Sequence, residues 1–319
     1  MLSENFKAKK VFIAGYKGMV GSAITRSLQS NGYTNLLLAD KSDVDLMRQE
    51  SVESYMATRK PDMMIIAAAK VGGILANNTY RAEFLYNNLM IEANLIHAAY
   101  ENGVSKVVFL GSSCIYPKLA PQPLKEESLL SGYLEYTNEP YAIAKITGIK
   151  LCESYYKQYG SNFFSMMPTN LYGYFDNFDL NTSHVLPALM RKFDTAVKEG
   201  SDTVLLWGTG TPKREFMFVD DLADAIRFSL ENIDAKDLYE NGITHLNVGT
   251  GEDLMISELA TLIAQITGFK GKIEYDTSKP DGTPRKIMDV SRINNLGWKH
   301  KTSLEEGIKL TYNWYKERS

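Results

Sequence analysis

The chain has 319 residues, of which 44% are hydrophobic and 23% charged, and its formal net charge is −3. This length supports a large core, and a balanced charge without a basic stripe argues against nucleic acid or an acidic membrane as a partner. The two cysteines lie far apart in the sequence, which indicates no disulfide framework and favours a reducing cytoplasm. We find no apolar run long enough for a secretory signal or a membrane span, and we expect no metal site.

The first predicted strand leads into a glycine motif. The apolar run Val11–Ala14 is typical of a buried strand, and it is followed by Gly15-x-x-Gly18-x-x-Gly21 and an amphipathic helical pattern. In this order Gly15 permits the turn, and Gly18 lets the backbone approach a pyrophosphate that the helix N-terminus attracts. The sequence therefore predicts a dinucleotide-binding site.

The second predicted strand, Asn35–Ala39, leaves the choice of dinucleotide open. It ends at Asp40, and an acid at this point typically binds the ribose 2′-hydroxyl of NAD. The neighbouring Lys41, and Lys17 in the glycine turn, instead suit the 2′-phosphate of NADP. Two positive charges against one negative charge lead us to expect NADPH.

A serine–cysteine motif follows the fourth predicted strand. Met63–Ala69 and Lys106–Leu110 have the apolar pattern of strands, with a helix from Tyr80 to Asn102 between them. Ligands of open α/β sheets bind at the carboxyl ends of the strands, where Ser112 and Cys114 stand. We therefore expect Ser112 to bond a substrate carbonyl, and Cys114 to have a chemical role rather than one in packing.

The helix that Asn138 is predicted to cap carries Tyr141 and Lys145 on one face, one turn apart. An ammonium beside a phenol favours the phenolate and lowers its pKa from about 10. Tyr141 is thereby predicted to exchange protons near neutral pH. Tyr312 and Lys316 have the same spacing, but no comparable motif precedes them, and we interpret them as part of a surface helix.

The second half is less regular. His184 precedes a helical run on the ligand side, beyond the fifth strand, and Trp207 ends a strand where its ring could stack on a guanine or fill a core. The helix that begins at Val219 is expected to return to the first domain. The elements predicted here are the strands 162–167 and 204–207 and the helices 185–198, 219–230, 257–268 and 303–315.

Three runs resemble a known family closely: Gly111–Lys118, Thr137–Lys145 and Pro168–Gly173. They look like the GDP-L-fucose synthase family, the GDP-4-keto-6-deoxy-D-mannose 3,5-epimerase/4-reductases of the extended short-chain dehydrogenase/reductase superfamily. The resemblance extends from Lys10 to about Trp314. The further runs that carry it are 67–74, 176–178, 183–185, 207–212, 214–216 and 279–286.

The resemblance implies a role for each site residue. Ser112, Tyr141 and Lys145 would form the reductase triad, and Cys114 and His184 the acid/base pair of epimerisation. The cofactor would be NADP(H), and Asp40 departs from the family's pattern at a position where an acid repels a 2′-phosphate. The positions that would contact the GDP-sugar are Lys192, Trp207, Arg214 and Asp281, and those that would contact the cofactor are Gly15, Lys17, Gly18, Met19, Val20, Gly21, Lys41, Ala68, Leu110, Lys145, Pro168, Asn170, Leu171 and His184.

The chemistry of a 4-keto sugar agrees with these roles. Its C3 and C5 hydrogens are acidified by the carbonyl, and inversion needs a base on one face and an acid on the other. A thiol near pKa 8.5 and an imidazole near 6.5 can exchange protons around pH 7. The resulting enolate charge on O4 could accept hydrogen bonds from Ser112 and Tyr141, which then serve the reduction at C4.

Pattern and resemblance together predict an α/β fold, a Rossmann-type doubly wound parallel sheet with a smaller α/β substrate-binding lobe. We expect an NADP(H)-binding domain from residues 1–173 with 219–249, and a GDP-sugar lobe from 174–218 with 250–319. Residues 231–243 are interpreted as a variable surface loop. We further expect a homodimer through the helix at Tyr80–Asn102 and the small-residue helix after Tyr141.

Two alternatives remain open. A related epimerase/reductase on another GDP-4-keto-deoxy sugar, of the colitose type, would share every catalytic residue. A non-catalytic NADP(H)-sensing regulator is disfavoured because such proteins usually lack the Tyr/Lys pair. The sequence also leaves open whether Cys114 or His184 acts at C3 or at C5.

Overall fold

The computed structural model describes residues 4–180, 182–279 and 281–318. The strands are β1 Val11–Ala14, β2 Leu36–Leu37, β3 Met63–Ile66, β4 Lys106–Leu110, β5 Phe163–Pro168, β6 Asn170–Tyr172, β7 Thr203–Trp207, β8 Lys213–Phe218, β9 Leu246–Val248, β10 Asp253–Met255, β11 Lys272–Asp276 and β12 Arg285–Lys286. The α-helices are α1 Glu4–Lys7, α2 Met19–Ser30, α3 Gln49–Arg59, α4 Ile74–Thr79, α5 Arg81–Glu101, α6 Glu139–Tyr159, α7 Val185–Glu199, α8 Val219–Asn232, α9 Ala235–Tyr239, α10 Ile256–Thr267, α11 Ser291–Asn295 and α12 Leu304–Lys316. Two 3₁₀ turns are η1 Ser113–Ile115 and η2 Glu126–Ser128.

The central sheet has six parallel strands in the order β2-β1-β3-β4-β5-β9. Its inner strands are almost continuously apolar, and every residue of β1, β3 and β4 is buried. Strands of this kind form where helices cover both faces of a parallel sheet. The predicted Rossmann-type α/β fold is confirmed.

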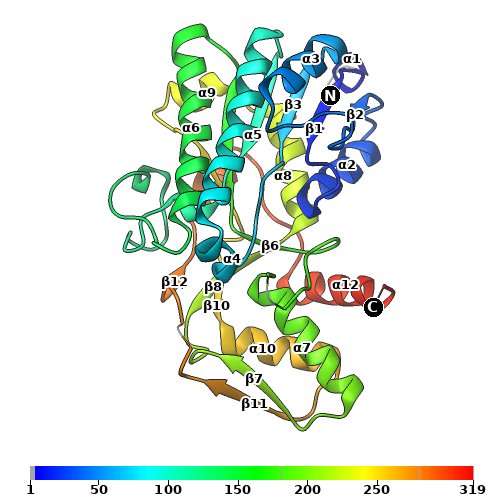
Figure 1. Ribbon diagram of the computed structural model, residues 1–319, viewed down its shortest axis with the longest axis vertical. Coiled ribbons are helices and arrows are strands. Elements are labelled where there is room, and N and C mark those ends of the chain that lie inside the picture. Colours follow the sequence, from blue (N-terminus) through cyan, green and yellow to red (C-terminus); the bar gives the residue numbers. More distant parts are fainter. Residues whose placement is uncertain (1–3, 181, 280, 319) are drawn as a thin grey trace.

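Two layers of helices cover this sheet. The helices α2 and α8 pack together as one layer, and α5 packs between α3 and α6 as the other (Figure 1). Because the strands are parallel, their carboxyl ends lie at one edge, so the loops after β1, β3, β4 and β5 meet there. This edge carries the glycine turn, the serine–cysteine motif and the start of α6.

A second group of elements lies at the other end of the long axis (Figure 1). There β8 pairs with β10, β12 and β6, and β7 pairs with β11. The helices α7, α10 and α12 bury an apolar cluster of their own, which includes Phe193, Leu259 and Ile308. The pairing of β6 with β8 joins this group to the end of β5.

The segment between β12 and α12 returns to the first core. Met288, Ile293 and Trp298 are buried in the cluster formed by the central sheet and its helices. We therefore infer that a division into two lobes assigns residues 287–298 to the nucleotide-binding part, and the other expected boundaries stay a proposal.

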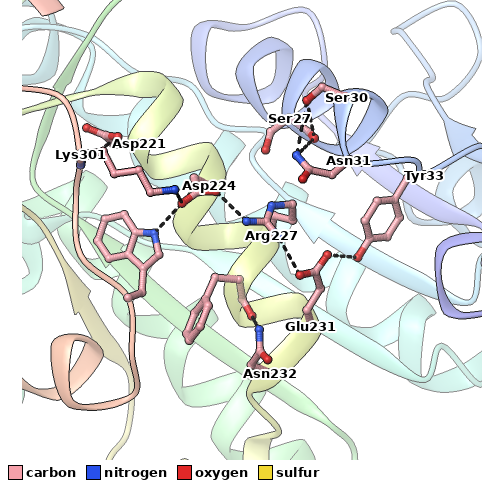
Figure 2. Close-up of polar contacts among 12 residues, drawn as sticks. Ser27, Ser30, Asn31, Tyr33, Asp221, Asp224, Arg227, Glu231, Asn232 and Lys301 are labelled. Atoms are coloured by element: carbon pink, nitrogen blue, oxygen red, sulfur yellow. Dashed lines mark hydrogen bonds and ion pairs between the residues drawn. The ribbon is translucent and has the colours of Figure 1, made fainter. Parts of the chain in front are cut away.

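A polar network joins α8 to the loop after α2 and to the segment that leads into α12 (Figure 2). Arg227 pairs with Asp224 and Glu231, and Glu231 also accepts a hydrogen bond from the hydroxyl of Tyr33, 3.2 Å away. The ammonium of Lys301 lies 3.0 Å from Asp224, which also accepts a bond from the indole of Trp298. These pairs hold the chain that leads into α12 against the nucleotide-binding part.

The interpretation of residues 231–243 as a variable surface loop is wrong. The segment contains α9, and Ile233, Ala235 and Leu238 are buried in the first core. Asp234 lies 2.8 Å from the ammonium of Lys106. Its acidic residues had suggested a solvated loop, whereas burial of the apolar residues between them fixes the segment.

The predicted elements differ from the observed ones mainly at their ends. The second strand is shorter than expected, and the helix expected from Tyr80 is α5, which follows the separate short helix α4. None of the helices within the described residues is long and apolar enough to cross a membrane.

Candidate active site at the carboxyl edge of the parallel sheet

The glycine turn packs tightly against the loop after β3. Gly15 has φ +88°, and a Cβ there would lie 2.7 Å from the backbone nitrogen of Ala68. A Cβ on Gly21 would collide with the carbonyl of Gly15, so the first turn of α2 rests directly on the glycine turn. Gly18 is the N-cap of α2, whose first turn contains no acidic residue among its described positions. Met19 and Val20 open this helix, and the N–H groups of a first turn are the donors that a pyrophosphate would use.

Asp40 is paired within the site. Its carboxylate accepts a hydrogen bond from Lys17 at 2.6 Å and two more from the backbone and hydroxyl of Ser42. These bonds hold the pKa of Asp40 well below its usual range, and the bond to Lys17 has the largest effect. Lys41 next to it is exposed. Asp40, whose charge argued against NADP, is therefore neutralised by Lys17, one of the two lysines that argued for NADP.

The remaining predicted cofactor positions lie along the same edge. Pro168 ends β5, and Asn170 and Leu171 follow it in β6. The amide of Asn170 donates to the carbonyl of Glu215 at 2.8 Å, and Leu110 ends β4. This arrangement brings the residues to one edge, but whether they contact a cofactor stays a proposal.

Ser112 lies near Tyr141, a member of its predicted triad, and near Cys114 of the predicted acid/base pair. Its hydroxyl accepts a hydrogen bond from the backbone N–H of Cys114 at 3.4 Å, which caps η1. The same hydroxyl lies near enough to the thiol of Cys114 and the phenol of Tyr141 to lower the pKa of each. A serine, a thiol and a phenol thus meet at the end of β4.

The predicted lowering of the Tyr141 pKa is wrong for the ligand-free chain. Burial raises this pKa well above its ordinary value, and the negative charges of Cys114 and Glu92 raise it further. Asn138 also departs from prediction, because its side chain makes no capping bond to any described residue and its Oδ1 is buried without a described partner. Pro140 begins α6 in the expected way.

Lys145 is buried, and it bonds to a residue that the sequence analysis missed. Its Nζ lies 2.8 Å from Oε1 of Glu92 in α5 and donates to the carbonyl of Leu110 at 3.1 Å. The Nζ also lies 4.8 Å from the ring centre of Phe109 and 5.8 Å from that of Tyr141. A signal for Glu92 was present, because Phe84, Asn88 and Glu92 are spaced by four and share the buried face of α5.

A second missed residue, Lys286, stands beside the predicted acid/base pair. Burial raises the pKa of the Cys114 thiol, and the charge of Lys286 opposes that rise. Both residues line a pocket of about 50 Å³ that also includes Asn138 and Gln122. Lys286 lies in the run 279–286 that carries part of the resemblance, but only Asp281 of that run had been assigned a role. The larger pocket, about 110 Å³, contains none of the predicted residues.

His184 is the N-cap residue of α7 and remains accessible to solvent. The backbone N–H of Gly73 donates to the carbonyl of Thr182 at 3.0 Å, and a Cβ on Gly73 would lie 2.8 Å from the carbonyl of Ser183. The loop before His184 is therefore held against the loop after β3. Desolvation by the surrounding protein lowers the pKa of His184, and the charge of Lys286 lowers it further. Lys286 therefore acts on both members of the predicted acid/base pair.

The predicted sugar-nucleotide positions lie in the second part. Trp207 is 63% exposed, which excludes the core role considered for it. The ammonium groups of Lys192 and Lys279 lie 5.9 and 5.6 Å from its ring centre. An exposed aromatic face with two cations beside it suits a stacked base that carries phosphates.

Arg214 and Lys286 are register partners on the adjacent strands β8 and β12. Asp281 accepts hydrogen bonds from the backbone and hydroxyl of Thr209, at 2.6 and 2.9 Å, and so fixes the turn after Trp207. Burial lowers the pKa of Arg214, and Asp281 opposes this. The two adjacent cations can hold an anionic group between the Trp207 face and the acid/base pair.

A buried network anchors the loop that carries Cys114. The hydroxyl of Tyr116 lies 2.7 Å from Nε2 of His245 and also bonds to Asn247 in β9. The amide of Asn247 donates to the carbonyls of Leu124 and Asp289, at 2.9 and 3.1 Å. This loop, the central sheet and the segment after β12 are thereby tied together.

Comparison with known proteins identifies relatives along the whole chain. The sequence model of the NAD dependent epimerase/dehydratase family matches residues 11–249. GDP-L-fucose synthase of Escherichia coli K12 is 54% identical over 97% of this chain and 97% of its own, and GDP-L-colitose synthase of Yersinia pseudotuberculosis is 40% identical over 96% and 97%. A GDP-mannoheptose C4 reductase from Campylobacter jejuni, solved with NADP bound, is similar with a TM-score of 0.90, at 42% identity, over 97% of this chain and 99% of that one.

Proposed function

The chain belongs to the NAD dependent epimerase/dehydratase family, and we propose that it is a GDP-L-fucose synthase. It would invert C3 and C5 of GDP-4-keto-6-deoxy-D-mannose and then reduce C4 with NADPH. The observation that carries this proposal is the meeting of Ser112 with both Cys114 and Tyr141 at the end of β4. A reductase needs the triad of Ser112, Tyr141 and Lys145, whereas the buried thiol of Cys114 beside it adds an acid/base group.

The residues of the glycine turn fit NADP(H). The close contact of Gly15 with Ala68 and the free first turn of α2 leave room and donors for a pyrophosphate. Lys17 and Lys41 would hold the 2′-phosphate, and Lys145 the nicotinamide ribose. NADPH supplies the hydride that C4 receives. The relative from Campylobacter jejuni that was solved with NADP bound supports this cofactor.

Epimerisation would use Cys114 and His184 as the two proton-exchanging groups. One removes the proton from C3 or C5, and the other returns a proton to the opposite face. Lys286 lowers the pKa of both. Its charge therefore opposes the rise that burial causes in the pKa of Cys114, and it makes His184 a stronger acid.

Reduction would use the same oxyanion site. Ser112 and Tyr141 donate hydrogen bonds to O4, both when it carries enolate charge and when C4 is reduced. Tyr141 then gives its proton to O4. Its raised pKa keeps it protonated, which is the form that a reductase needs.

The GDP part of the substrate would bind across the second group of elements. Trp207 offers its exposed face to the guanine, and Lys192 and Arg214 lie where the diphosphate would follow. Asp281 would act by fixing the turn after Trp207. The bidentate geometry of Arg214 suits a phosphate, whereas Lys192 acts as a point charge.

For assembly, we infer a homodimer in which α5 and α6 of each subunit form the interface. The two helices pack side by side, and each exposes large apolar side chains, Tyr86 on α5 and Ile143 and Tyr159 on α6. Sedimentation of the protein at micromolar concentration is expected to give the mass of two chains. A single-chain mass would contradict this interface.

The cytoplasm is the proposed location. Both Cys114 and Cys152 are free and buried, and the proposed role of Cys114 requires a reduced thiol. A reducing compartment preserves that state.

The direct test is incubation of the protein with GDP-4-keto-6-deoxy-D-mannose and NADPH, followed by NMR of the sugar product. GDP-L-fucose is expected. A product that retains the D-manno configuration at C3 and C5 would exclude the epimerase part. Turnover of a GDP-4-keto-3,6-dideoxy sugar in preference to this substrate would favour the colitose-type alternative, and absence of NADPH oxidation with either would revive the non-catalytic regulator.

A further inference from the structure

The structure assigns a function to Glu92, a residue to which the sequence analysis gave no role. We propose that Glu92 is the positioning residue of Lys145 and holds its ammonium where it can serve both Tyr141 and the nicotinamide ribose. This inference rests on the proposed reductase activity. Glu92 would not touch substrate or cofactor, and its effect would pass through Lys145.

The pair is enclosed by protein. The residue Glu92 is 0% exposed and Lys145 is 1% exposed, and the two approach to 2.8 Å. The ammonium of Lys145 donates one hydrogen bond, to the carbonyl of Leu110, and forms an ion pair with Oε1 of Glu92. An ammonium has three donors, so one remains for a ligand on the side of Tyr141.

The neighbouring residues leave room for this carboxylate. A Cβ on Gly148 would collide with the ring of Phe109 and lie 3.0 Å from Oε2 of Glu92. Gly148 therefore allows α6 to approach α5 closely next to the ion pair of Glu92 and Lys145. Phe109 closes the space from the sheet side, with its ring centre 4.8 Å from Nζ of Lys145.

Stability alone does not account for such a pair. Removing two charges from water costs several kcal/mol per ion, and apolar residues of similar volume often serve as well. Neither carboxylate oxygen of Glu92 accepts a hydrogen bond from a described residue, although the site is fully buried and Oε1 lies 2.8 Å from Nζ of Lys145. A role in setting the place and charge of Lys145 explains why this position carries an acid.

Three other titratable groups interact with the pair within the described residues. Tyr141 and Cys152 face it from α6, and Cys114 faces it from η1. The charge of Glu92 raises the pKa of Tyr141 and of Cys152, whereas Lys145 opposes the rise of the Glu92 pKa that burial causes. Loss of the Glu92 charge would therefore let Tyr141 deprotonate at a lower pH.

The test is Glu92→Gln, which keeps the shape and removes the charge. We expect kcat for C4 reduction to fall roughly 10-fold or more, and the alkaline limb of its pH profile to move about one unit lower, the usual effect of one nearby charge. The matched control is Glu153→Gln on α6, which removes a carboxylate paired with Lys150 and Lys157 away from the site. It should keep the wild-type profile. If Glu92→Gln keeps the wild-type kcat and the wild-type alkaline limb, the proposal is overturned. Glu92 would then serve packing only, because a packing role alters the amount of folded protein and not its pH profile.

A second readout separates this inference from the proposed activity. NADPH affinity, measured by fluorescence titration without any sugar, should weaken roughly fivefold in Glu92→Gln, on the order of one hydrogen bond. If wild type fails to reduce the sugar, the proposed function fails while this affinity still decides the role of Glu92. If Glu92→Gln does not fold, Glu92→Asp is measured instead, since it keeps the charge but withdraws the carboxylate. We then expect weaker NADPH binding at an unchanged alkaline limb, and wild-type affinity would contradict the proposal.

Discussion

The ammonium of Lys17 lies 2.6 Å from a carboxylate oxygen of Asp40. An acid after the second strand usually indicates NAD, because it binds the ribose 2′-hydroxyl and repels a 2′-phosphate. Here the lysine of the glycine turn reaches across to that acid and neutralises it. The pair turns an apparent conflict in the sequence into a site that can accept a phosphate.

Lys17→Met should therefore reverse the cofactor preference. Without its partner, Asp40 presents a bare carboxylate to the 2′-phosphate, and we expect the KM for NADPH to rise roughly 10-fold, on the order of one charge-assisted hydrogen bond. The KM for NADH should change little or fall. Steady-state kinetics with both cofactors measures this, and an equal change for the two would show that Lys17 does not read the phosphate. Lys41→Ala should raise only the KM for NADPH.

Tyr141→Phe should abolish reduction while cofactor affinity is retained. The hydroxyl is required only when O4 takes up its proton, whereas Lys145 stays paired with Glu92 and Leu110. We expect kcat to fall about 10²- to 10⁴-fold, the usual contribution of a general acid. NADPH titration and single-turnover reduction together check this. A variant that retains a third of the wild-type rate would remove Tyr141 from the triad.

Lys286→Met should shift the pH dependence of epimerisation. The charge of Lys286 lowers the pKa of Cys114 and that of His184, so its removal raises both. The thiolate then forms at higher pH, and the acidic limb of hydrogen exchange at C3 and C5 should move upward by about one unit. Arg285→Gln is the control, since the neighbouring guanidinium pairs with Asp253. An unmoved limb would mean that Lys286 serves substrate binding alone.

His245 should make the fold sensitive to acid. Burial, with the charges of Lys150 and Arg292, lowers its pKa to about 3, whereas an unfolded histidine titrates near 6.5. The unfolded state therefore binds a proton that the folded state does not bind, and the free energy of unfolding falls as pH drops from about 6.5 toward 3. Between pH 7.5 and 5 this histidine should account for a loss of ~2 kcal/mol.

Urea unfolding at the two pH values, for wild type and His245→Gln, measures that contribution. Glutamine can still bond to the hydroxyl of Tyr116 but takes up no proton. The stability of the variant should therefore depend less on pH by the amount predicted. The same pH dependence in both proteins would exclude His245 as the source.

The sequence was sufficient for features that depend on local pattern. The continuous apolar runs predicted β1, β3, β4 and β5, and the glycine spacing predicted the turn that Gly15 makes. Parallel strands bring their carboxyl ends to one edge, so the approach of Ser112 to Tyr141 also followed from order along the chain. The observed strands and helices match these expectations apart from their ends.

Features that depend on tertiary pairing could not be predicted in the same way. The pKa of Tyr141 was predicted from the lysine one turn away, but burial of the phenol raises it. Glu92, which pairs with that lysine, lies about fifty residues earlier on another helix. Lys286 reaches Cys114 only because β12 pairs with β8. The capping role of Asn138 was predicted from residue type, and the fold instead buries its Oδ1.

The most direct test of the central claim is hydrogen exchange in D2O without NADPH. Proton removal at C3 and C5 needs no hydride, so wild type should exchange deuterium into both carbons of GDP-4-keto-6-deoxy-D-mannose, as NMR can follow. Cys114→Ser raises the side-chain pKa by several units and removes the thiolate, and exchange should fall roughly 10²-fold or more. With NADPH this variant should still reduce C4, because Ser112, Tyr141 and Lys145 are intact. Two results would contradict the claim that epimerisation and reduction are separable steps at one oxyanion site. One is undiminished exchange in Cys114→Ser. The other is loss of reduction together with exchange in a folded variant that binds NADPH.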